Sequence, residues 1–325
     1  MDETVSRRQA CGRIVRAGGA IGAAAALGGA LWDRGGPNRT EDGARAQTRD
    51  FRLRDRRLDR PDLAIAKQAS DDPAQLTRAA IDALGGMSRF ISRGDVVTVK
   101  PNIGWDRTPV HAANTNPRVV AELVRLAFDA GAKTVTVTDA SCNEPNRCFQ
   151  RSGIWKAAYD VGADVIIPAE HRFRGMRLGG EVLDDWPIYR PLVEADKVIN
   201  VPVAKHHNLA KFTAAMKNWY GLLGGRRNRL HQNIDTSIAD LATFMQPTLT
   251  VVDATRVLLR NGPQGGNIAD AKDIGVVIAT VDQVAADAYA CQFVGVKRED
   301  LPYVKMGHER GLGTMFWERL HHVEV

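Results

Sequence analysis

Three consecutive basic residues, Lys205-His206-His207, follow an apolar run over residues 198–203, where an ordinary loop would more often carry Gly, Ser or Asp. A lysine in a cleft can hold a phosphate or carboxylate as a point charge, and a desolvated lysine can attack a carbonyl carbon. A neutral imidazole can carry protons near pH 7 or bind a metal ion. We therefore predict Lys205, His206 and, shortly after them, Lys217 as catalytic residues.

Polar residues also stand near the ends of other apolar runs. Because ligands bind outside the carboxyl ends of the strands in open α/β sheets, these residues are the next candidates. The predicted substrate-binding residues are Lys100, Asn102, Asp139, Asn218 and Asp253. A divalent metal ion is one cofactor that the histidines suggest, and its predicted ligands are His207 and His231.

Each candidate also has a structural interpretation. Lys100 and Asn102 flank Pro101, which can simply end a strand, and a carboxylate such as Asp139 can form a turn or cap a helix. Asp282 precedes a helical pattern, as an N-cap residue does. The two interpretations differ in the expected geometry. Parallel strands present their ends on one edge, so a functional site requires these side chains to converge there: Lys100, Lys205, His206 and Lys217.

Several ordered segments resemble the family called domain of unknown function 362. They are VKPN at 99–102, VPVAKH at 201–206, AMKNWYG at 215–221 and TVDQVAAD at 280–287. Asp253, the glycine-rich turn at 262–266 and Gly311-Leu312-Gly313 fit the family's downstream pattern, so the resemblance covers about residues 63–313. Members often carry ferredoxin-like cysteine clusters. This sequence has no C-x-x-C pair, so no iron–sulfur cluster is expected.

Short β-rich runs alternate with helical patterns along the chain. The expected strands lie at 63–66, 96–100, 135–138, 164–167, 198–203, 249–252 and 274–279. The expected helices lie at 72–84, 116–131, 153–161, 235–247 and 282–294, the fourth with Asp235 as its cap. Alternation of this kind predicts an α/β fold with a mainly parallel sheet and helices on both faces, in three layers.

The N-terminal residues have the order of an export signal. A pair of arginines, Arg7-Arg8, precedes an uncharged run over residues 17–31 and a small-residue triplet that ends at Ala46. This order indicates a twin-arginine signal peptide over residues 1–46, although an uncleaved anchor is an alternative. A polar linker is expected over 47–62 and one α/β domain, with two sub-lobes left open, over 63–325. The protein is then expected to be periplasmic or secreted, with the twin-arginine export machinery as a partner.

Composition limits the classes of partner. The net charge of the whole chain is +6, and +4 remains without residues 1–46. This charge is too small, and too little interleaved with aromatic residues, to indicate nucleic-acid binding. Cys142 and Cys148 lie six apart in an expected loop and can form a disulfide after export, the alternative being free thiols.

Two classes of function remain. The first is a metal- or cofactor-dependent enzyme that acts on a small anionic molecule in a cleft lined by lysine and histidine. The second is a non-catalytic periplasmic protein that binds an anion or a metal ion. A histidine that meets a lysine or a carboxylate within hydrogen-bond reach in one enclosed pocket would favour the enzyme, and a shallow open groove would favour the binding protein.

Overall fold

Local signals begin and end the helices close to where the sequence predicts them. The structure, a computed structural model, describes residues 48–53, 59–67 and 72–325. Helix α3 (Pro117–Asp129) begins after Asn116, whose side chain accepts a hydrogen bond from the Arg118 N–H, and Gly131 follows its end with a φ of 98°. The other α-helices are α2 (Pro73–Ala83), α4 (Pro145–Arg151), α5 (Ile154–Tyr159), α6 (Ile234–Phe244), α7 (Gln283–Ala290) and α8 (Pro302–Glu309).

The central sheet is mixed but mainly parallel. Its main path runs β14 (His322–Glu324), β2 (Leu63–Lys67), β13 (Ala271–Thr280), β12 (Leu249–Leu258), β8 (Lys197–Val201), β3 (Val96–Pro101), β4 (Thr134–Thr138) and β5 (Asp164–Ile166). Strand β9 (Val203–His207) pairs with β12, and β10 (Lys211–Thr213) pairs with β9. On the main path, β13 is antiparallel to both of its neighbours, while the remaining pairs are parallel.

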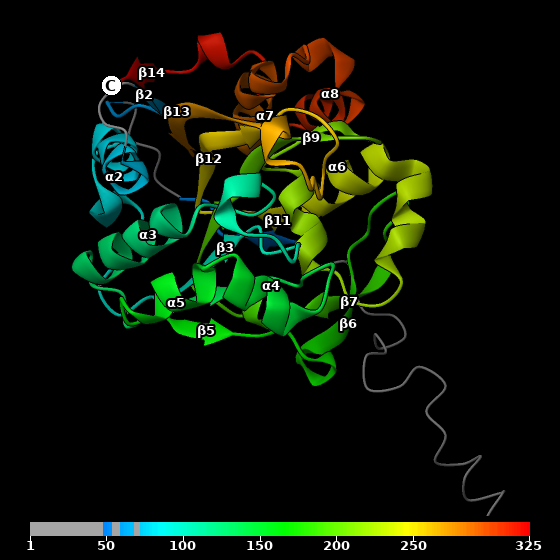
Figure 1. The fold of residues 1–325 in the computed structure, drawn as a ribbon, viewed down its shortest axis with the longest axis horizontal. Coiled ribbons are helices and arrows are strands. Elements are labelled where there is room, and N and C mark those ends of the chain that lie inside the picture. Colours follow the sequence, from blue (N-terminus) through cyan, green and yellow to red (C-terminus); the bar gives the residue numbers. More distant parts are fainter. Residues whose placement is uncertain (1–47, 54–58, 68–71) are drawn as a thin grey trace, which may run out of the picture. The chain divides into compact units, whose positions relative to one another are not determined.

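Helices cover both faces of this sheet, so the predicted three-layer α/β class is confirmed. One apolar core joins α2, α3 and α5 to residues such as Val97, Val137 and Val251 of the sheet. The other joins α6, α7 and α8 to the opposite face, where Val252 and Ile278 point. Figure 1 shows α2 and α3 on one side of the strands and α6 to α8 on the other. The alternation of side chains along each strand assigns neighbouring residues to different cores.

The expected strand at 198–203 is in fact two strands, and the second reaches further than predicted. Pro202 separates β8 from β9; it lacks an N–H for the ladder. Strand β9 then continues through Lys205 to His207, which were predicted to lie in a loop. The predicted end of β12 is also wrong, because the strand runs past Asp253 to Leu258 along β13.

Two further boundaries differ from the prediction. Helix α6 is preceded directly by a 3₁₀-helix over Arg227–Asn233, so Asn233 stands at its N-cap position and Asp235 lies in its first turn. Within the predicted linker, Arg49–Asp50 forms a short strand, β1, which pairs with β11 (Met245–Gln246).

A separate hairpin joins β6 (Phe173–Arg177) to β7 (Asp185–Tyr189). The predicted signal peptide lies outside the described residues.

None of the helices in the described part of the chain reaches the length and apolarity that crossing a bilayer requires.

Candidate functional site

A cavity of about 470 Å³ lies beyond the carboxyl ends of β3 and β4. Strand β9, strand β10 and the 3₁₀-helices over Lys217–Leu222 and Arg227–Asn233 supply the rest of its wall. Seven of the predicted site residues line it: Asn102, Asp139, Lys205, His207, Lys217, Asn218 and His231. The edge of the sheet chosen from the sequence is therefore the edge at which these side chains meet.

Three predicted site residues do not line the cavity. His206 points to the other face of β9, as alternation along a strand requires, and its Nδ1 accepts a hydrogen bond from the Gly262 N–H at 3.2 Å. Asp253 is buried inside β12 and accepts from the Asn116 N–H at 2.7 Å, at the start of α3. Lys100 is buried behind the cavity wall. The prediction that four basic side chains share one pocket is thus wrong for Lys100 and His206.

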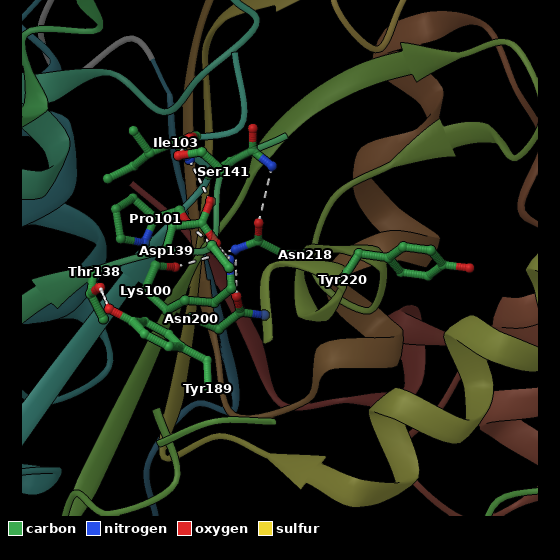
Figure 2. Close-up of polar contacts among 12 residues, drawn as sticks. Lys100, Pro101, Ile103, Thr138, Asp139, Ser141, Tyr189, Asn200, Asn218 and Tyr220 are labelled. Atoms are coloured by element: carbon green, nitrogen blue, oxygen red, sulfur yellow. Dashed lines mark hydrogen bonds and ion pairs between the residues drawn. The ribbon is translucent and has the colours of Figure 1, made fainter. Parts of the chain in front are cut away.

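Lys100 is instead half of a buried ion pair. Its Nζ lies 2.7 Å from Asp139 Oδ1, and the second carboxylate oxygen of Asp139 accepts from the Ile103 N–H at 2.7 Å (Figure 2). Burial lowers the pKa of Lys100, whereas the charge of Asp139 raises it. Gly221 packs against this pair so closely that a Cβ would lie 1.8 Å from Asp139 Oδ1. The pair therefore holds the loops after β3 and β4 together beneath the cavity.

Three asparagines extend this framework. Asn218 donates to the carbonyl of Lys100 at 3.2 Å and to Asn200 Oδ1 at 2.8 Å, and Figure 2 shows this contact between the loop and the sheet. Asn200 donates in turn to the Ala215 carbonyl at 2.9 Å. Asn102 donates to Asn218 Oδ1 at 3.2 Å. The side-chain amide of each of these asparagines donates through its nitrogen and accepts through its oxygen. Each amide therefore has a fixed orientation, and together they form the polar floor of the cavity.

Lys205 rests on this floor. Its Nζ donates to Asn102 Oδ1 at 3.0 Å and to the Ala113 carbonyl oxygen, and the residue is only 2% exposed. Burial lowers the pKa of Lys205 to about 7, and the charge of Lys217 adds to this effect. Both acceptors are neutral, so the amine and the ammonium are both accessible forms near neutral pH.

Lys217 lies across the cavity over an aromatic ring. Its Nζ is 4.4 Å from the centroid of the Tyr220 ring, a cation–π contact. Burial, with a smaller contribution from the charge of Arg227, lowers the pKa of Lys217 to about 8. Among the described residues, none accepts a hydrogen bond from this ammonium or forms an ion pair with it. Its N–H groups are therefore available to a ligand.

Asp287 positions the segment that carries Lys217. This carboxylate is fully buried and accepts hydrogen bonds from the backbone N–H groups of Ala215 at 2.5 Å and Met216 at 3.0 Å. Burial raises the pKa of Asp287 to about 7, and the two N–H groups oppose that shift. Asp287 lies in α7, and the side chain of Asp282 accepts hydrogen bonds from the Val284 and Ala285 N–H groups at the start of this helix. Asp282 is therefore the N-cap residue that the sequence suggested.

The two cavity histidines do not make a metal site. His207 Nδ1 accepts hydrogen bonds from the N–H groups of Leu209 and Ala210, so the ring carries its hydrogen on Nε2 and offers no free lone pair. Burial and the nearby cations lower the pKa of His207 to about 2, and it is a neutral donor. His231 lies 6.3 Å away between ring centroids, and among the described residues no third His, Cys, Asp or Glu completes a ligand set. The donors present do not fit the predicted metal ion.

Arg227 and Cys142 line the cavity but are not among the predicted residues. Arg227 donates to the carbonyls of Ala140 and Tyr220 at 2.8 and 3.0 Å, to that of Ser141, and to Cys142 Sγ at 3.4 Å. The sequence feature that could have indicated Arg227 is the pair of glycines followed by two arginines at 224–227.

The predicted disulfide is absent from the structure. Cys142 is exposed at the cavity and Cys148 is buried in α4, and both are free thiols. Burial raises the pKa of Cys148 to about 11.

The cavity carries an excess of positive charge. Lys205, Lys217 and Arg227 line it, and among the described residues Asp139 is its one carboxylate. Asp139 is already engaged by Lys100 and by the Ile103 N–H. Fold and site together define an α/β protein with a cationic, partly enclosed cavity at the carboxyl edge of a mainly parallel sheet.

The chain belongs to the family described as "Domain of unknown function (DUF362)", whose model matches residues 97–292. It is 24% identical over 245 residues to the thylakoid-associated protein sll1697 of Synechocystis, covering 72% of this chain and 74% of that protein. The resemblance seen in the sequence is thereby confirmed.

Two solved structures are more distant. One is a protein of Thermotoga maritima and the other the lactate racemase apoprotein of Thermoanaerobacterium thermosaccharolyticum, each 12% identical with a TM-score of 0.41. The matches cover 69% and 74% of this chain but 59% and 58% of those chains, so the chain spans about three fifths of their length.

Proposed function

We propose that this protein is an exported enzyme that binds a small organic anion in the cavity at the carboxyl edge of the sheet. The observation that carries the proposal is the ammonium of Lys217, which lines the same cavity as Lys205 and Arg227 and which no described residue pairs or hydrogen-bonds. Like charges gathered in a cavity destabilise it when it is empty, and a bound anion relieves that cost. Proteins accept such costs mainly at functional sites.

A non-catalytic anion-binding protein is the alternative, and Lys205 favours the enzyme. A binding protein needs fixed cations, whereas burial brings the pKa of Lys205 to about 7, where it exchanges protons with a bound molecule. Lys205 and the neutral His207 also line the same partly enclosed cavity. Metal dependence is not part of the proposal, because the Nδ1 lone pair of His207 already accepts hydrogen bonds from two backbone N–H groups.

Lys217→Gln is expected to weaken the binding of inorganic sulfate by about tenfold to a hundredfold, because it removes a charged donor from the anion. Isothermal titration calorimetry measures the effect directly. Lys133→Gln is the matched control: it makes the same change in net charge at an exposed position before β4, on the opposite edge of the sheet. Equal losses in the two variants would mean that sulfate responds to overall charge and that the cavity is not the site.

Export is expected to depend on the arginine pair. Replacing Arg7 and Arg8 together by lysine keeps the charge but removes the signal that the twin-arginine pathway reads, so the protein should remain in the cytoplasm. Fractionation of cells that produce either form measures the outcome, with a known periplasmic protein as the fractionation control. An unchanged periplasmic level of the double variant would contradict export by this route.

A further inference from the structure

The Lys205 nitrogen lines the cavity and is fixed by two hydrogen bonds. Two of its N–H groups point to neutral acceptors, Asn102 Oδ1 at 3.0 Å and the carbonyl of Ala113. A tetrahedral amine has four positions, and the side-chain carbon and these two hydrogens occupy three of them. In the unprotonated amine the fourth position holds the lone pair. No carboxylate in the described part of the chain binds this nitrogen, whereas Asp139 binds Lys100.

Lys217 supplies a second, different element in the same cavity. Its ammonium has no hydrogen-bond acceptor among the described residues, and it lines the same cavity of about 470 Å³ as Lys205. A single small molecule can therefore meet both lysines, provided that its anionic group is close to the carbon that Lys205 contacts. A carboxylate bonded directly to a carbonyl carbon satisfies this condition.

We propose that Lys205 forms an imine with the carbonyl carbon of a small 2-oxo acid whose carboxylate is held by Lys217. This inference rests on the anion site proposed above and names its substrate class. The nitrogen lone pair attacks the carbonyl carbon, the C=O π electrons move to oxygen, and a proton passes from nitrogen to that oxygen. The C–O bond of the carbinolamine then breaks and the C=N bond forms. Both amine hydrogens leave with the oxygen as one water molecule, and nothing is oxidised or reduced.

The surroundings of Lys205 suit this reaction. Asn102 is fixed by Asn218, and its Oδ1 can accept from the single N–H of the imine once the imine nitrogen has taken up a proton from solvent. His207 stays neutral and carries its hydrogen on Nε2. Because this N–H donor has no positive charge, it does not compete with Lys217 for the carboxylate. The cavity of about 470 Å³ exceeds what a three-carbon acid requires, so longer 2-oxo acids also fit.

Reductive trapping tests the proposal. The full chain is incubated with pyruvate and sodium cyanoborohydride, and peptides are then mapped by mass spectrometry. The peptide that contains Lys205 is expected to gain the mass of pyruvic acid less one oxygen atom. Pyruvamide, which lacks the charge, should label Lys205 about tenfold less, because the Lys217 contact is lost. Lys205→Arg should abolish this label, while Lys217→Gln should reduce the label about tenfold.

The contrary outcomes are separable. Pyruvate that binds in calorimetry but leaves Lys205 unlabelled would overturn the imine and leave the anion site standing. Labelling spread evenly over exposed lysines, or confined to Lys217, would overturn it as well. If neither pyruvate nor sulfate binds, both the imine and the proposed function fail. Because the mapping uses the unmodified sequence, it decides the question even if a Lys205 variant does not fold.

Discussion

Lys100→Met is expected to lower the free energy of unfolding by about 3–5 kcal/mol, the cost of leaving a buried carboxylate without its cation. Lys100 is 0% exposed, and its Nζ bridges Asp139 Oδ1 and the Pro101 carbonyl. Methionine matches the length of the lysine stem but brings no charge and no N–H. Equilibrium unfolding in urea, followed by circular dichroism, measures the change.

A double variant separates the charge from the packing. Lys100→Met with Asp139→Asn is expected to recover part of the loss, because the amide oxygen still accepts from the Ile103 N–H and no charge remains unpaired. Lys133→Met, at an exposed position, serves as the control and should change the stability little. A Lys100→Met protein as stable as the control, or a double variant no more stable than the single one, would contradict the ion-pair explanation.

Sulfate binding is expected to weaken as pH rises from 6 to 9. Burial places the pKa of Lys205 at about 7 and that of Lys217 at about 8, so each loses its charge within this range. An anion binds more tightly when Lys205 and Lys217 are both protonated. Sulfate binding is therefore coupled to proton uptake, and the affinity falls as the two lysines lose their protons. If bound sulfate raises each pKa by about one unit, the affinity falls about tenfold for each lysine. Sulfate itself does not titrate in this range.

Other charged groups at the cavity should not produce this profile. His207 stays neutral because its pKa is lowered to about 2, and Asp139 is held by Lys100. Calorimetry on Lys205→Arg, which keeps its charge, should remove the step near pH 7 and leave the one near pH 8. Trapping by pyruvate needs the unprotonated Lys205 amine, so below pH 7 it should fall while sulfate binding rises. A sulfate affinity that is flat, or that increases with pH, would contradict the assignment.

Local sequence signals determined the elements. Helix α3 begins at Asn116-Pro117 and ends before Gly131. These signals can be read locally because an N-cap side chain, a proline at the first helical position and a left-handed glycine each act over a few residues. The alternation of apolar runs and helical patterns predicted the α/β class, since a parallel sheet must be covered on both faces. The rule that strand ends carry the ligand site then led to seven side chains that do line one cavity.

The tertiary structure decided which neighbours face that cavity. Lys205 and His206 are adjacent in sequence, yet β9 continues through both and turns them to opposite faces. Asp253 and Asp139 both follow apolar runs, but the pairing of β12 with β13 carries Asp253 into the strand, where it binds the start of α3. Strand length and partner depend on contacts between residues far apart in the chain, which a local pattern does not contain.

Charge partners depend on the same long-range contacts. The sequence predicts the same cleft for Lys100 and Lys217, and only the fold pairs Lys100 with Asp139 while leaving Lys217 over a tyrosine ring. Arg227 enters the cavity because a 3₁₀-helix carries it back to the ends of β3 and β4. The pKa of a lysine follows from its burial and from the charges around it, so the chemistry of Lys205 is a property of the folded chain rather than of its residue type.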